Sequence, residues 1–158
     1  MGHFNWLPKV DRFCWCIRNL RCACFIIIFV GLCTSIFTAS LLAKPACPDL
    51  FDASSPVRIL TDVFRWILFV SEMFLIVSCS AFMLGMFWSL PITADIFIGC
   101  ALINILILII FIPLLIIQEQ YYTNIYCGWY HSQILNLILY LIMLSYFVVV
   151  VNSYKEEM

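Results

Sequence analysis

Charged side chains are scarce in this sequence of 158 residues: Asp, Glu, Lys and Arg together make up 11% of it, and the formal net charge is −1. Soluble globular domains carry about 25% charged residues, so the composition excludes an ordinary soluble domain. A net charge this close to zero also provides no general attraction to nucleic acid or to acidic partners.

Catalytic signatures are missing as well. Only two histidines occur, His3 and His131, and the sequence has no Ser-His-Asp arrangement and no HExxH, P-loop or dinucleotide-binding motif. It has no C-x-x-C pair, which a thiol oxidoreductase of the four-helix kind would need. It also has no Asn-x-Ser/Thr sequon for N-glycosylation. We therefore expect no enzyme, no cofactor, no metal site and no small-molecule substrate.

Hydrophobic residues, in contrast, make up 65% of the sequence and gather in four long runs. The runs are Phe25–Ala43, Trp66–Trp88, Ile96–Ile117 and Ile134–Val151, and Glu72 is the only formally charged residue in any of them. About 20 helical residues are needed to cross the hydrocarbon core of a bilayer. We predict a single all-α membrane domain over residues 1–158, with spans at about 22–43, 65–88, 96–117 and 133–151. The first span is expected to be retained, because no signal-peptide cleavage site follows it.

The connections between these runs are short, which favours an antiparallel bundle of four transmembrane helices in up-down-up-down order. Positive charges set the expected orientation. The terminal segments carry Lys9, Arg12, Arg18, Arg21 and Lys155, against Lys44, Arg58 and Arg65 between the first two runs. This bias predicts that both termini face the cytoplasm (N-in/C-in). Residues 44–64 and 118–132 then form outer loops, and residues 89–95, with Pro91 at the turn, form an inner loop.

Glu72 is the first candidate for chemistry, because a carboxyl group inside a membrane costs a few kcal/mol unless it is paired or protonated. At 1.5 Å per residue it is expected about 9 Å below the outer interface. Arg65 is on the same helix face, and Asn104 and Asn136 are further intramembrane polar candidates for partners. Two interpretations remain: a proton or cation relay or interhelical lock, and an acid that only fixes helix packing.

A cluster of cysteines lies at the cytoplasmic edge of the first span: Cys14, Cys16, Cys22 and Cys24. Juxtamembrane cysteines are acceptors for S-palmitoylation, which is the leading interpretation. Zinc binding is an alternative, although C-x-C spacing suits zinc less well than wider pairs. The third alternative is that these cysteines have no special role.

The two predicted outer loops carry another pair of features. Cys47 and Cys127 would both face the oxidising side, so they either form a disulfide bond or remain as two thiols. The second outer loop is rich in aromatic residues, namely Tyr121, Tyr122, Tyr126, Trp129 and Tyr130. Such a patch is typical of a contact surface for another protein, and equally of anchoring at the membrane interface.

Two short segments, together with the four spans and their small loops, resemble a known family. The segment Phe13-Cys14-Trp15-Cys16-Ile17-Arg18, which leads into the first span, and Val150-Val151-Asn152-Ser153-Tyr154, which closes the fourth, are similar to the insect four-span membrane proteins that include the Pasiflora proteins. These are components of septate junctions, and they are distantly similar to the lysosome-associated four-span transmembrane proteins. The tail here lacks the P-P-x-Y element of the lysosomal proteins.

The resemblance implies a non-enzymatic protein that assembles laterally with other membrane proteins, or with copies of itself, and contributes to an epithelial barrier at a septate junction in the lateral plasma membrane. The alternative is a trafficking or transport-accessory protein of endolysosomal membranes. A third hypothesis, an ion or proton pathway through Glu72, has the least support from the sequence.

Overall fold

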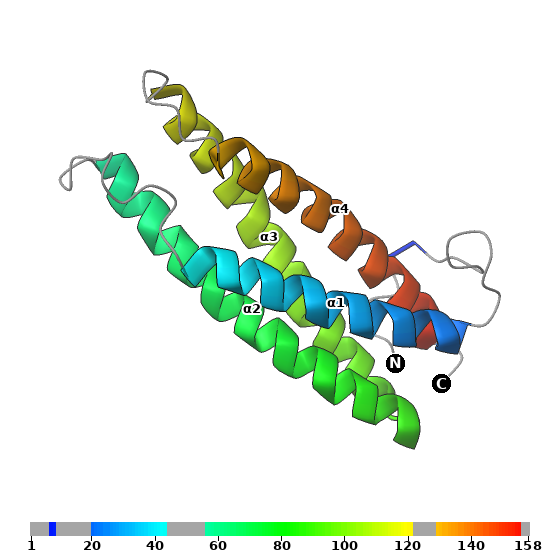
Figure 1. Cartoon of the computed structure of the whole chain (residues 1–158). Helices are drawn as coiled ribbons and strands as arrows, with labels where there is room; N and C mark the ends of the chain where they lie inside the picture. The colour runs from blue at the N-terminus through cyan, green and yellow to red at the C-terminus, as the bar shows by residue number, and fades with distance from the viewer. Residues whose placement is uncertain (1–6, 9–19, 44–55, 122–128, 156–158) are drawn as a thin grey trace.

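The structure is a computed structural model that describes residues 7–8, 20–43, 56–121 and 129–155, apart from the side chains of 56–58, 118–121 and 129–132. Four helices account for nearly all of these residues: α1 (Leu20–Ala43), α2 (Pro56–Trp88), α3 (Pro91–Tyr121) and α4 (Trp129–Lys155) (Figure 1). Each contains a stretch long and apolar enough to cross a membrane. The predicted all-α, four-helix membrane fold is therefore confirmed.

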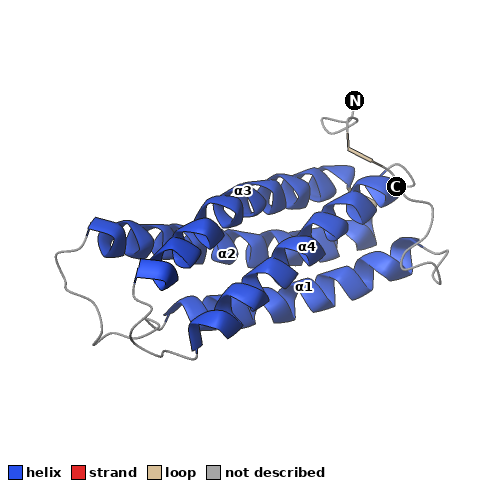
Figure 2. Ribbon diagram, turned by 90° about the horizontal axis from the view of Figure 1, so that it is seen from above, coloured by secondary structure: helices blue, strands red, loops and turns tan. Residues whose placement is uncertain are grey.

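The helices run antiparallel to their neighbours, so α1 begins and α4 ends at the same end of the bundle (Figures 1 and 2). Helix α2 packs against α1 and α3, and α4 packs against α3 and α1, which closes a ring of four. Within the described residues, no Cα atom of α2 comes within 8 Å of α4, and the same holds for α1 and α3. These two pairs therefore face each other across the diagonals of the bundle.

Helix α2 is longer at its beginning than the sequence led us to expect. It begins at Pro56, and its apolar stretch begins at Ile59 and ends at Trp88. Proline suits the first position of a helix, because that residue needs no backbone N–H there. Glu72 therefore lies about 20 Å along the axis from Ile59 and about 24 Å from Trp88, at 1.5 Å per residue. It is close to the middle of this apolar stretch.

A very short turn joins α2 to α3, because α3 begins at Pro91 and not after residue 95 as expected. Ser89 adopts a positive φ of 52°, and the backbone N–H of Leu90 donates a hydrogen bond to the carbonyl oxygen of Gly85 at 2.9 Å. Gly85 allows the two helices to approach closely. A Cβ atom at that position would lie 1.9 Å from Oγ1 of Thr93.

Polar contacts close the end of the bundle where α1 begins and α4 ends. Lys155 at the end of α4 forms an ion pair with Asp95 near the start of α3. The guanidinium of Arg21 in α1 donates to the backbone oxygen of Met86 in α2 at 3.3 Å. These contacts connect α3 to α4 and α1 to α2 at the same level, so this end of the bundle is fixed by side chains as well as by the turn.

Candidate functional site

One buried polar cluster lies inside the bundle, and each helix contributes one side chain to it. The members are Ser35 of α1, Glu72 of α2, Asn104 of α3 and Tyr140 of α4, and we call this cluster the polar node. Ser35, Glu72 and Asn104 have no exposed surface, and Tyr140 is 5% exposed. Apolar side chains pack around it, so the node forms a polar layer within an otherwise hydrophobic core.

The position of each member follows from the spacing of buried residues along its helix. Buried side chains recur alternately every three and four residues, which is the spacing that helices of a four-helix bundle direct toward a shared core. The four inward stripes are Cys24, Ile28, Gly31, Ser35, Thr38 and Leu42; Leu68, Glu72, Leu75, Cys79, Phe82 and Met86; Phe97, Ala101, Asn104, Leu108, Phe111 and Leu115; and Leu137, Tyr140, Leu144, Phe147, Val151 and Tyr154.

The hydrogen bonds of the polar node converge on the carboxyl group of Glu72. Asn104 donates from Nδ2 to Oε1 at 3.0 Å, and the hydroxyl of Tyr140 donates to Oε2 at 2.8 Å. The Ser35 hydroxyl oxygen lies 3.0 Å from that of Tyr140. Because the single hydroxyl hydrogen of Tyr140 points to Glu72, Ser35 is the donor in this last bond. The chain of donors therefore runs from α1 through α4 to α2.

One atom of the polar node is left without a partner. Oδ1 of Asn104 is buried and accepts no hydrogen bond from any residue that the structure describes. An unsatisfied buried acceptor of this kind costs about 1–3 kcal/mol. One hydrogen-bond acceptor of the polar node, which belongs to α3, therefore lacks a donor.

Of the partners that the sequence suggested for Glu72, the structure brings Asn104 to it. Asn136 is exposed on the surface of α4. The guanidinium of Arg65 instead pairs with Asp62 at 3.3 Å and lies 5.9 Å from the centre of the Trp66 ring. Sequence reasoning missed Ser35 and Tyr140, although both fall on the inward stripes and that spacing was the signal available.

The remaining candidate residues are placed as follows. Cys22 is exposed at the start of α1, and Cys24 is fully buried. The other predicted residues lie outside the described part of the chain (Cys14, Cys16, Cys47, Cys127, Tyr122 and Tyr126) or in helical segments whose side chains are not described (Tyr121, Trp129 and Tyr130). Among the described residues, no group of three or more His, Cys, Asp or Glu side chains could hold a metal ion.

Comparisons with protein-family models, with curated proteins and with solved structures found no match to this chain. The resemblance to insect four-span proteins rests on the segment before the first span, on the four spans with their small loops, and on the segment that ends the fourth span.

Proposed function

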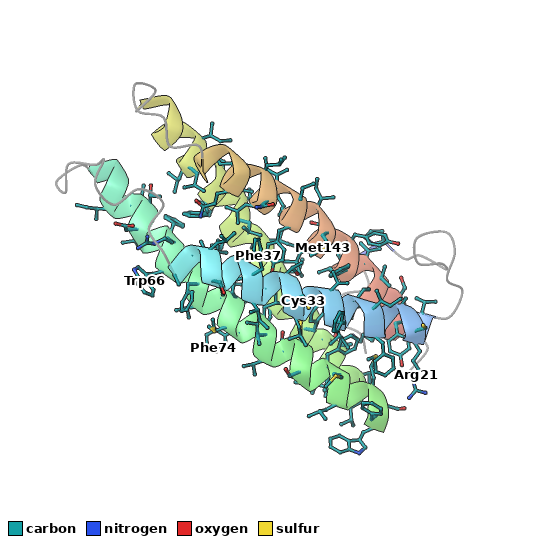
Figure 3. The ribbon with its side chains drawn as sticks, viewed as in Figure 1. Arg21, Cys33, Phe37, Trp66, Phe74 and Met143 are labelled. Carbon is teal, nitrogen blue, oxygen red and sulfur yellow. The ribbon has the colours of Figure 1, made fainter. Side chains whose placement is uncertain are left out.

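We propose that this integral membrane protein is a non-enzymatic component that assembles laterally with other membrane proteins, in a septate-type junction of an epithelium. The observation that carries the proposal is the outer surface of the bundle. Large apolar and aromatic side chains project from it, among them Phe37, Trp66 and Phe74 (Figure 3). Within a bilayer, such a surface packs against lipid chains or against the helices of neighbouring proteins.

The polar node supports a structural role in this proposal. Hydrogen bonds among buried side chains hold transmembrane helices together, and here they connect all four helices through Glu72. On α2, the residues above and below Glu72 on the inward stripe are Leu68 and Leu75, which are apolar and buried. A relay would need successive polar groups across the membrane. The arrangement favours a lock between helices over an ion pathway.

The location at a junction comes from the resemblance to insect four-span proteins and is the finer part of the proposal. The lateral plasma membrane is the expected site, and endolysosomal membranes are the alternative. A protein that acts in trafficking would be found on acidic vesicles, whereas a junction component would gather at cell–cell contacts. The membrane in which the protein accumulates therefore separates the two functions.

Imaging of the tagged full-length protein in a polarised insect epithelium tests the proposal, together with a dye-exclusion assay after loss of function. Lateral enrichment, a leaky epithelium and rescue by the intact gene product are the expected results. Chemical cross-linking in the same membranes should capture the protein with neighbours. Vesicular signal with an intact barrier would contradict the junction and favour the trafficking role.

The Glu72→Gln variant distinguishes a protein that assembles with partners from one that conducts ions or protons. Glutamine retains the size of the side chain and an oxygen that accepts a hydrogen bond, but it cannot carry a negative charge. If the protein is a scaffold, this variant should still reach the lateral membrane and restore the barrier. A variant that localises normally but fails to restore the barrier would point to a role for the charge itself.

A further inference from the structure

The polar node lacks a donor at one place, and Glu72 is the group that can supply it. Oδ1 of Asn104 is buried without a partner among the described residues, while the Nδ2 atom of the same amide donates to Glu72. A carboxylate is only an acceptor, whereas a protonated carboxyl group also carries one O–H donor. A proton on Glu72 would therefore add the donor that Asn104 lacks.

The charges around the polar node favour the same conclusion. The side chains that face Glu72 are uncharged: Ser35 from α1, Asn104 from α3, and Tyr140 from α4. The titratable groups near it are Tyr140 and Cys79, with Cys100 of α3 beside Cys79. The charged side chains described elsewhere in the four helices are Arg21, Asp62, Arg65, Asp95 and Lys155. On α2 the nearest in sequence is Arg65, seven residues before Glu72, and it pairs with Asp62. A carboxylate at the node has no counter-charge there, and a proton would neutralise it.

The hydrogen bonds also accommodate the charged form. When Glu72 is ionised, the amide of Asn104 and the hydroxyl of Tyr140 donate to its two oxygens. When Glu72 is protonated, the same amide offers both a donor and an acceptor to the acid, so the two groups can exchange two hydrogen bonds. Both forms find partners inside the bundle, which is the requirement for a group that exchanges a proton without unfolding.

We propose that the polar node is a proton-binding site, in which Glu72 takes up one proton from water and releases it again, and Oδ1 of Asn104 accepts a hydrogen bond from the protonated acid. The proton adds to a carboxylate oxygen, and no other bond forms or breaks. The site is independent of the junction role, since it depends only on the contacts within the bundle.

Infrared difference spectroscopy of the full chain in phosphatidylcholine vesicles tests this proposal. The carbonyl stretch of a protonated carboxyl group is distinct from the bands of a carboxylate, and hydrogen bonding lowers its frequency. We expect one such band to persist at pH values where the exposed carboxyl groups of the chain are already ionised, to give way reversibly to carboxylate bands as the pH rises further, and to be missing from the Glu72→Gln spectrum. In Asn104→Leu the band should move to higher frequency, because the acid loses its amide partner.

The matched control is Asp62→Asn, which removes another carboxyl group from α2, one that pairs with Arg65 and not with the polar node. This variant should keep the band. Selective ¹³C labelling of glutamate in a variant with Glu119, Glu156 and Glu157 replaced by glutamine leaves Glu72 as the only labelled glutamate, so a failure of one Glu72 variant to fold does not decide the outcome. A glutamate band that does not change with pH while the amide bands stay helical would overturn the proposal. A response to sodium at constant pH would overturn it in favour of a metal cation.

Discussion

Tyr140 of α4 donates a hydrogen bond of 2.8 Å to Glu72 of α2, although the backbones of these two helices do not approach each other within the described residues. The long phenol side chain of Tyr140 reaches across the diagonal between α4 and α2, two helices that do not pack against each other. With Ser35 behind it, this bond connects α1, α2 and α4 in one chain. The bundle is therefore held together by hydrogen bonds across its centre as well as by helix packing around its perimeter.

Removal of this bond by Tyr140→Phe should lower the free energy of unfolding by about 1–3 kcal/mol, because one buried acceptor and the Ser35 hydroxyl lose their partner. Thermal unfolding in mixed micelles measures the change. Ser145→Ala is a suitable control, since Ser145 is exposed and its hydroxyl bonds only to the backbone of its own helix at 2.8 Å. Equal stability of the two variants would show that the bond does not brace the bundle.

Two substitutions of Glu72 should differ in their consequences for stability. Glutamine supplies an N–H for the unpartnered Oδ1 of Asn104 but keeps only one of the two oxygens that accept from Asn104 and Tyr140, so Glu72→Gln should unfold near the temperature of the unmodified protein. Glu72→Leu leaves the Asn104 amide and the Tyr140 hydroxyl without an acceptor and should cost about 2 kcal/mol or more. The comparison uses thermal unfolding in one lipid–detergent mixture. A leucine variant that is the more stable of the two would contradict the assigned hydrogen bonds.

Two glycines of the bundle provide a matched test of helix packing. Gly85→Ala places a Cβ atom 1.9 Å from the Thr93 side chain, so α2 and α3 must move apart, and overpacking of this kind costs about 1–3 kcal/mol. At Gly99 nothing lies within 4 Å of the added Cβ, and alanine favours the helix by up to about 1 kcal/mol. Gly85→Ala should therefore destabilise the protein and Gly99→Ala should not. Thr93→Gly should recover part of the loss at Gly85, and no recovery would place the strain elsewhere.

Acylation at the start of α1 should select the exposed cysteine of the described pair. Cys22 is exposed and Cys24 is fully buried, and an acyltransferase has to reach the sulfur atom. In a background where Cys14 and Cys16 are replaced by serine, Cys22→Ser should abolish the mass shift of an acyl-exchange assay, and Cys24→Ser should preserve it. The reverse result would mean that the start of α1 separates from the bundle before modification.

The amino-acid sequence by itself determined that the chain crosses a membrane four times, because the length and apolarity of a run fix whether it can span the hydrocarbon core. It also singled out Glu72 and Asn104, since polar groups stand out within apolar runs. The helix ends were harder to predict: residues 56–64 carry both charged and apolar side chains, and only the structure continues α2 through them.

The tertiary structure alone decided which groups meet at the polar node. Asn136 and Tyr140 are four residues apart and differ by only about 40° around the helix axis, yet Tyr140 is buried and Asn136 is exposed. The rotation of α4 in the bundle makes that choice, and rotation is set by packing against α1 and α3. The local sequence does not determine this rotation, because both positions lie in the same apolar run. The free-energy difference between burying Tyr140 and burying Asn136 comes from neighbours on other helices.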